Sequence, residues 1–245
     1  AVYKDGGTDG NLNPFDGEIF EFLNYNKSLN SAQKKIIENY FAAKFDDNIE
    51  TDMVNDYYQY QATHNYDVFG IGKDDDDNSH IISQGTGIIK VDEPRDMDNG
   101  DYMIIGHDNG DIASWTDVNV PFDSVYRVTR QWRVDKTNDV GELRVSVDTT
   151  GLAAKPANYE EFVLLTSTDN NWSNGDEELY PLTDLIGNMK RTQDDDPVNF
   201  NDGAYFTIGI ARNRTIRDGT WGADSVWLTG KVPGPNETAL ISEHD

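Results

Sequence analysis

The sequence predicts a mostly β fold: an antiparallel β-sandwich, Ig-like or jelly-roll-like, with one amphipathic helix near the N-terminus. From residue 68 onward, short segments carry apolar side chains at alternate positions, and Asn-Gly or Asp-Gly pairs stand between several of them. Only one segment shows the three-to-four-residue apolar spacing of an amphipathic helix. Short strands joined by tight turns, without a second helix, are typical of β-sandwiches.

The N-terminal part predicts an extended strand. Residues 18–25 alternate between two faces, so that Glu21 and Leu23 point to one side and Phe20 and Phe22 to the other.

The helix is predicted to begin after Asn30, whose side chain can accept a hydrogen bond from a free N–H group of the first turn. Gln33 follows three residues later, where it completes a capping box. The run Asp46-Asp47-Asn48 is predicted to end the helix. Between these ends, one stripe carries Ile36, Ile37, Tyr40, Phe41 and Lys44.

Seven further segments predict strands, because residues that favour strands alternate in them with polar residues. They are Val68–Ile71, Gly87–Val91, Tyr102–Ile105, Tyr126–Val134, Glu142–Val147, Phe162–Thr166 and Tyr205–Ile210. Turns are predicted at Asn99-Gly100, Asn109-Gly110, Asn174-Gly175 and Asp202-Gly203. Near the C-terminus, residues 224–230 predict a strand that completes a neighbour's sheet, and Pro233-Gly234-Pro235 predicts a linker.

The composition excludes several classes of function. With 45 Asp and Glu against 20 Lys and Arg, the 245-residue chain has a formal charge of −25, which repels nucleic acids and anionic membranes. It has no cysteine, so disulfides, thiolate catalysis and zinc-thiolate sites are excluded. No apolar run approaches the roughly 18–20 residues that span a bilayer, and we expect no direct membrane insertion.

Carboxylates concentrate in loops, and calcium is therefore the candidate cofactor. Calcium takes about six to eight oxygen ligands, which aspartate, asparagine and backbone carbonyls supply on loops. The competing interpretation is that these loops are solvated and raise solubility. The candidate ligands are Asp74 and Asp76, then Asp96, Asp98 and Asp101, and finally Asp169 and Asp176.

We find no catalytic motif and predict that the protein is not an enzyme. Glu18 and Glu21 are the nearest approach to a glycosidase pair, but two side chains three positions apart on a strand point to opposite faces. A retaining glycosidase needs two carboxyls about 5–5.5 Å apart. The four histidines are scattered. Of these, His107 is predicted to have a hydrogen-bonded structural role.

Aromatic residues support the alternative function, a carbohydrate-binding module. Trp172 lies in a polar loop and is predicted to expose its ring for stacking on a sugar, with Asn171 and Asn174 as ligand-binding neighbours. The competing interpretation is a ring that fills a packing gap. Trp132 alternates with arginines on a predicted strand and is expected to lie in the core.

Seven segments, in one order along the chain, carry a resemblance to known proteins. They are Gly17–Leu29, Ser31–Phe45, Asp67–Asp75, Ile105–Gly110, Arg130–Val134, Val140–Val145 and Asp202–Gly209. Together they resemble an arrangement in very large secreted surface proteins of Bacteroidota. In that arrangement a LamG-like (concanavalin-type) domain ends in a strand and a helix, and a β-rich module follows.

The resemblance implies export by type IX secretion, an extracellular location at the cell surface, and a structural or adhesive role in attachment, gliding motility or a filament. It implies that residues 1–48 are the end of a LamG-like domain with a connecting helix. Residues 49–212 would be the β-sandwich module, and residues 213–245 an extension. The implied partners are neighbouring modules or subunits of the same surface protein, with glycans as partners in the carbohydrate-binding alternative. The resemblance supplies no catalytic residues.

Overall fold

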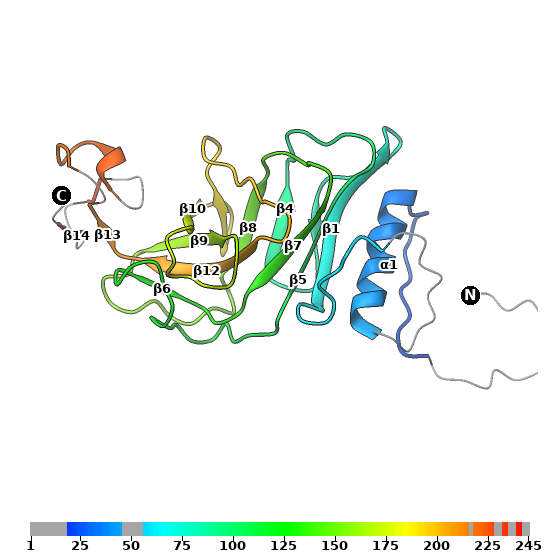
Figure 1. Cartoon of the computed structure of the whole chain (residues 1–245), viewed down its shortest axis with the longest axis horizontal. Coiled ribbons are helices and arrows are strands. Elements are labelled where there is room, and N and C mark those ends of the chain that lie inside the picture. Colours follow the sequence, from blue (N-terminus) through cyan, green and yellow to red (C-terminus); the bar gives the residue numbers. More distant parts are fainter. Residues whose placement is uncertain (1–18, 46–55, 216–217, 228–231, 235–238, 242–245) are drawn as a thin grey trace, which may run out of the picture.

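The fold is mostly β, with one α-helix at the N-terminal end of the described chain and a nearly closed antiparallel sheet beside it (Figure 1). These elements come from a computed structural model that describes residues 19–45, 56–215, 218–227, 232–234 and 239–241. The predicted class, an antiparallel sandwich with one N-terminal helix, is confirmed. None of the described helices is long and apolar enough to cross a bilayer. The domain boundaries at residues 48 and 212 stay a prediction.

Helix α1 (Ser31–Phe45) begins where the sequence predicts, and its capping box is formed. The Gln33 N–H donates to Asn30 Oδ1 at 2.9 Å, and the Asn30 N–H donates to Gln33 Oε1 at 3.2 Å. Each side chain therefore satisfies a backbone donor of the other residue. The side chains that α1 buries are Ala32, Ile36, Asn39 and Ala43.

Twelve strands form one sheet, in the order β2-β1-β5-β7-β12-β9-β10-β11-β8-β4-β3, with β6 paired on β12. Every pair is antiparallel. The bounds are β1 (Tyr66–Asp75), β2 (Asn78–His80), β3 (Ser83–Gln84), β4 (Ile89–Asp92), β5 (Asp101–His107), β6 (Val125–Arg127), β7 (Trp132–Thr137), β8 (Arg144–Asp148), β9 (Glu161–Ser167), β10 (Glu178–Asp184), β11 (Met189–Thr192) and β12 (Tyr205–Ala211).

The sheet nearly closes on itself, because its two edge strands are consecutive in the chain. Only Ile81 and Ile82 separate β2 from β3. Strand β3 lies near β1 but forms no ladder with it, so a seam remains between these two strands. At this seam Phe69 lies so close to Gly85 that an added Cβ would come within 3.3 Å of its ring.

Three apolar clusters hold the fold together. The main core fills the inside of the curved sheet, where Ile71 of β1 and Val145 of β8 belong to one cluster. A second cluster lies between α1 and the outer face of β1 and β5, where Val68 and Ile104 are buried. A third covers the outer face of β9 and β12 and contains Trp172. The predicted core position of Trp132 is confirmed, since its side chain belongs to the main core.

The predicted strand Tyr126–Val134 is wrong as a single element, because the structure splits it into β6 and β7. The backbone between these two strands is hydrogen-bonded to the loop that contains Asp108 and Asp111. Asp111 O accepts hydrogen bonds from the Thr129 and Arg130 N–H groups, and Asp108 Oδ1 accepts one from the Gln131 N–H. These bonds replace the strand pairing that the alternation predicts.

Two other predictions need correction. Residues 19–25, predicted as a strand, are not in a sheet in the structure. Strands β10 and β11 were not predicted, because Pro181 and the charged residues around it weaken the alternation. Pro181 nevertheless lies opposite Val163 in the ladder.

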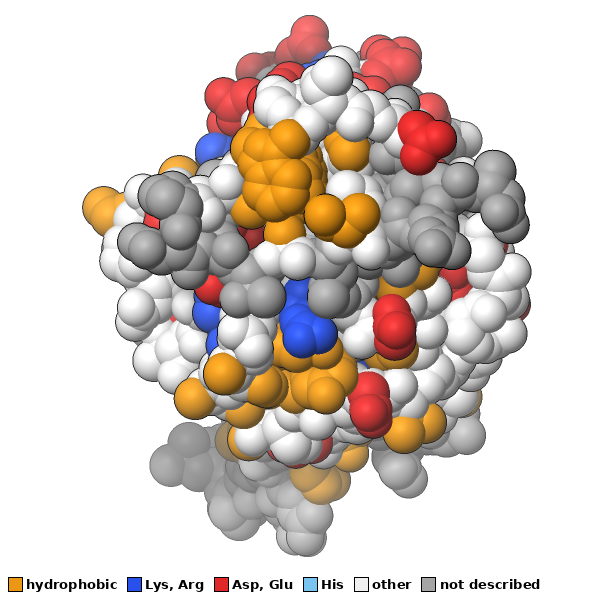
Figure 2. Space-filling model, turned by 90° about the vertical axis from the view of Figure 1, so that its left-hand side faces the viewer, with side chains coloured by type: hydrophobic (Ala, Val, Ile, Leu, Met, Phe, Trp, Pro, Cys, Tyr) orange, Lys and Arg blue, Asp and Glu red, His pale blue; other side chains and the backbone are white. Residues whose placement is uncertain are grey.

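The C-terminal end forms a small separate unit. Strands β13 (Asn213–Arg214) and β14 (Ala239–Leu240) pair in parallel, and the 3₁₀ helix η1 (Asp224–Val226) lies between them in the chain. The strand predicted over residues 224–230 is therefore wrong at Asp224–Val226, while residues 228–230 lie outside the described chain. Figure 2 shows hydrophobic side chains gathered in two groups on this end of the molecule, with a basic side chain between them.

Candidate functional site

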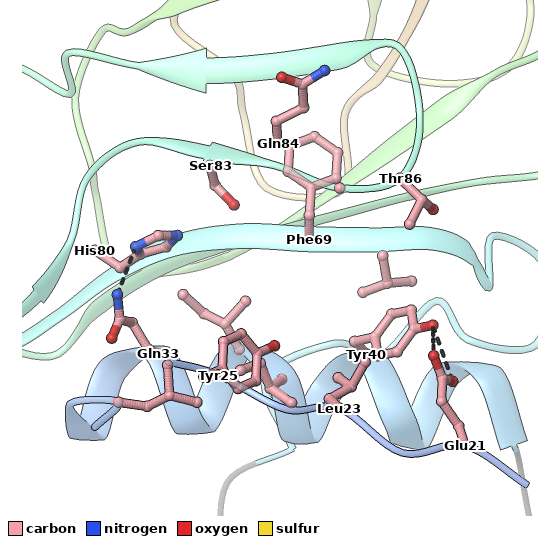
Figure 3. A pocket seen from close by; sticks show the side chains of 15 residues that line it. Glu21, Leu23, Tyr25, Gln33, Tyr40, Phe69, His80, Ser83, Gln84 and Thr86 are labelled. Atoms are coloured by element: carbon pink, nitrogen blue, oxygen red, sulfur yellow. Dashed lines mark hydrogen bonds between the residues drawn. The ribbon is translucent and has the colours of Figure 1, made fainter. Parts of the chain in front are cut away.

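A pocket of about 400 Å³ lies between helix α1, the extended residues 19–25 and the seam of the sheet (Figure 3). We term it the α1 groove. Leu23, Ile36 and Phe69, from these three elements, give it apolar walls. Glu21 and Tyr25 also line it, which confirms the predicted common face of Glu21 and Leu23, whereas Ile19, predicted on the same face, is exposed and does not line the groove.

Two polar pairs mark the ends of the α1 groove (Figure 3). At one end, the Tyr40 hydroxyl donates to Glu21 at 2.9 Å, and Lys44 Nζ lies 2.9 Å from the same carboxylate. The hydrogen bond from Lys44, reinforced by that from Tyr40, lowers the pKa of Glu21. At the other end, Gln33 Nε2 lies 3.4 Å from His80 Nδ1, and burial lowers the pKa of His80. The groove is thus apolar between two hydrogen-bonded ends.

Beside the groove, Asp67 joins three parts of the sheet across the seam. Its Oδ2 lies 2.9 Å from His107 Nε2 on β5, and the Thr86 hydroxyl, in the β3–β4 turn, donates to its Oδ1. We term these three residues the seam latch. Asp67 has a φ of +47°, a strained conformation for a residue other than glycine, at a bulge of β1. Gly87 lies close beside it, so that an added Cβ would come 2.9 Å from Asp67 Oδ2 and would push on the carboxylate that His107 holds.

Both ring nitrogens of His107 have hydrogen-bond partners. The Asn109 N–H donates to Nδ1 at 2.9 Å, so Nδ1 carries no proton and Nε2–H donates to Asp67. Arg130 Nη1, 3.4 Å from Nε2, is itself a donor and forms no hydrogen bond to a protonated nitrogen. The hydrogen-bonded role predicted for His107 is confirmed.

Replacing Asp67 with asparagine should lower the free energy of unfolding by about 1 kcal/mol at pH 7. The hydrogen bond from His107, with a second from Thr86, lowers the pKa of Asp67, which is therefore an ionised acceptor for both. The two donors bond to different carboxylate oxygens, and asparagine has an oxygen at only one of these positions, so its NH₂ group would replace the acceptor of the other bond. Urea unfolding followed by tryptophan fluorescence measures the change. Asp77→Asn, in an exposed turn, is the control, and an equal loss in both variants would contradict a specific latch.

A second polar cluster fastens α1 to the sheet. The Asp74 carboxylate accepts hydrogen bonds from the Ser31 hydroxyl, from Lys35 Nζ at 2.5 Å and from the Tyr102 hydroxyl at 2.5 Å. Burial opposes ionisation of Asp74, but these hydrogen bonds outweigh it and lower the pKa of the carboxyl. Asp74, predicted as a calcium ligand, thus has donors from both α1 and β5. Asp76 lies apart from it and pairs with Lys73 at 2.9 Å.

Three of the other candidate calcium ligands, Asp101, Asp169 and Asp176, also accept protein hydrogen bonds. Asp101 is buried and accepts the Asp98 N–H at 2.6 Å, whereas Asp96 and Asp98 are exposed. Asp169 accepts the Asn171 N–H at 2.7 Å, and Asp176 accepts the Thr168 N–H at 2.9 Å. Among the described residues, no three His, Asp or Glu side chains converge as metal ligands. The calcium site stays a prediction.

The prediction that Trp172 exposes its ring is wrong, because the side chain is fully buried. Val163 and Leu165 put apolar side chains on the outer face of β9, and Trp172 covers them. Its Nε1 donates to Gln131 Oε1 at 3.1 Å. The packing interpretation of this ring is confirmed, while Asn171 is exposed beside it. A usable signal was present in the sequence, since Val163–Leu165 is apolar on both faces and so requires cover on both.

The remaining candidate catalytic and ligand-binding residues are held by hydrogen bonds or lie outside the described residues. Glu21 is held by Tyr40 and Lys44, and Glu18 lies outside the described residues. Asn174 accepts the Asp176 N–H at 3.3 Å and donates to Asp169 at 3.1 Å, which fixes its side chain within its own loop. The α1 groove and the seam latch were not predicted from the sequence, because both form between segments that are distant in the chain.

Comparison with known proteins gives one match. Residues 33–204, from the first turn of α1 to the residue before β12, match a family described as a domain of unknown function (DUF8202). No curated protein and no solved structure matches the chain. Because the match covers well over half of the residues, the chain belongs to the DUF8202 family.

Proposed function

We propose that the chain is a non-catalytic structural or adhesive module of a large extracellular bacterial surface protein. In this proposal its N-terminal end is the face that contacts a neighbouring module. The observation that supports this most directly is that residues 19–25 run as an extended segment beside α1 without belonging to a sheet (Figures 1 and 3).

The backbone of this segment is available for pairing. Within the described chain, no N–H or C=O group of residues 19–25 has a hydrogen-bond partner. An extended backbone with a free row of donors and acceptors is a template for the edge of another sheet. A neighbouring β-module would satisfy these groups.

The outward side chains of the segment also favour a partner. Phe20 is 69% exposed and Phe22 is 79% exposed, on the face away from the α1 groove. The Phe20 ring lies 5.9 Å from that of Phe45, which extends the apolar surface onto the end of α1. In a chain with a formal charge of −25, contiguous apolar side chains on an extended segment favour a protein contact.

Hydrogen bonds and an ion pair connect residues 19–25, through α1, to the sheet. Glu21 is joined to α1 by Tyr40 and Lys44, and α1 is joined to β1 and β5 through Asp74. A neighbour paired with residues 19–25 would therefore be fixed relative to the sheet.

Hydrogen exchange tests this role of the segment. In the complete protein that contains this chain, the amides of residues 20–24 should exchange slowly, whereas in a fragment of residues 19–245 they should exchange at nearly the rate of an unfolded peptide. Phe22→Glu should abolish the protection in the complete protein and change the unfolding free energy of the fragment by less than about 0.5 kcal/mol.

Val118→Glu is the matched control, since Val118 is 69% exposed in a loop of the sheet domain, and it should leave the protection intact. Antibody raised against the sheet domain should label intact cells. Fast exchange at residues 20–24 in the complete protein would refute the junction, and labelling of permeabilised cells alone would refute the surface location.

A further inference from the structure

We propose that a polar pocket at one end of the main core binds a ligand through a primary ammonium group. The pocket has a volume of about 390 Å³ and lies where β9 and β10 meet the loop over residues 196–201. We term it the acidic pocket. Its floor contains Tyr180, Phe200 and Ala204, which all belong to the main core. Cavities of about 300–1,000 Å³ are usual for small ligands, and the ends of β-barrels are frequent sites for them.

All the charged side chains that line the acidic pocket are acidic. Glu142, Asp176, Glu178 and Asp196 line it, and its lining in the described chain includes no Lys or Arg. Glu142 is neutralised by Arg95 at 2.8 Å, and Asp176 accepts hydrogen bonds from the side chains of its own loop. Two carboxylates are left to attract a cation.

These two carboxylates, Glu178 and Asp196, have no basic partner in the described chain. Glu178 accepts one hydrogen bond, from the Tyr180 hydroxyl at 2.6 Å. Burial, and then the charges of Asp195 and Glu178, raise the pKa of Asp196. Both residues are exposed, but their negative charges lie close enough together to affect the pKa of Asp196, and a bound cation would relieve this repulsion.

A separate observation also indicates a ligand here. Thr166 lines the pocket and is only 8% exposed, and its hydroxyl has no hydrogen-bond partner among the described residues. The hydroxyl is not one of the fully buried polar atoms without a partner, so it is open to the space of the pocket. A ligand atom in the pocket would provide one for Thr166.

A primary ammonium fits this arrangement better than a metal ion. It carries three N–H donors, and the pocket offers three acceptor side chains, the carboxylates of Glu178 and Asp196 and the hydroxyl of Thr166. The rings of Tyr180 and Phe200 in the floor suit a cation with an attached alkyl chain. A metal ion would need a convergent set of ligands, and no three His, Asp or Glu side chains converge in this way in the described residues. The ammonium could belong to a small free amine or to a lysine side chain.

The test is an NMR titration of the chain with n-butylammonium chloride at constant ionic strength. We expect the amide signals of Thr166 and Tyr180 to shift and saturate with n-butylammonium, and to stay in place with n-butanol. Glu178→Gln and Asp196→Asn should each weaken binding about tenfold. Asp117→Asn removes one exposed charge elsewhere and should leave the affinity unchanged.

Nα-acetyl-lysine amide separates the two sources of the ammonium. Tighter binding than n-butylammonium would indicate a lysine side chain, and weaker binding would indicate a free amine. A response to calcium chloride without a response to n-butylammonium would overturn the proposal. So would an n-butylammonium affinity that neither Glu178→Gln nor Asp196→Asn reduces.

Discussion

Replacing Trp172 with alanine should lower the free energy of unfolding by about 3–5 kcal/mol. The ring is fully buried between the loop that carries it and the outer face of β9 and β12. Its removal would leave a large cavity, would leave Gln131 Oε1 without its donor, and would remove the ring over which the Arg127 guanidinium lies at 5.7 Å. Urea unfolding at neutral pH measures the loss.

Two further variants make this test specific. Trp172→Phe keeps most of the ring but loses the N–H donor, so its cost should be smaller, about 1 kcal/mol. Ile186→Ala, at a position 77% exposed, should change stability by less than about 0.5 kcal/mol. A normal stability of Trp172→Ala together with a loss of glycan binding would contradict the packing role and restore the carbohydrate-binding interpretation.

Acidification from pH 7 to pH 4.5 should destabilise the fold by about 2 kcal/mol through His64 alone. Burial lowers the pKa of His64 to about 4 from its ordinary value of 6.5. Between these two values the unfolded chain binds a proton that the folded chain does not, so stability is lost as the pH falls through this window. The nearby Arg133 adds to the effect, because it also opposes a charged ring.

The contribution of His64 can be isolated by substitution. Urea unfolding of the parent and of His64→Gln at pH 7 and pH 4.5 gives four free energies. The fall between the two pH values should be about 2 kcal/mol smaller in the variant, whatever its stability at pH 7. The carboxylates whose pKa is lowered, such as Asp67, release their contribution at still lower pH and so do not confuse the comparison. An equal fall in both proteins would contradict the assignment.

The parts of the fold that depend on neighbouring residues could be predicted from the sequence. The capping box of α1 was predicted correctly because Asn30 and Gln33 satisfy each other's backbone within one turn. The Asn99-Gly100 and Asp202-Gly203 turns were predicted correctly for the same reason, since Gly100 and Gly203 have φ values of +94° and +76° that glycine adopts without strain.

Features that depend on distant residues could not be predicted in this way. The seam latch joins Asp67 to a histidine 40 positions later, and nothing near Asp67 in the sequence indicates that pairing. The α1 groove can be recognised only when the position of α1 against the seam is known. For Trp172, its polar neighbours indicated exposure, whereas the outer face of β9 that it covers is formed by other residues. Periodicity reports which face of an element is apolar, but not which loop folds over it.

The two ends of the described chain lie at opposite ends of the molecule, which gives it a direction. Helix α1 lies at one end of the long axis, and β13 and β14 lie at the opposite end (Figure 1). A pull on a polypeptide that contains this module would therefore run along the whole barrel, from Asp74 at the α1 end to the parallel pair at the other. Under the proposed function, copies joined end to end would all lie in the same direction.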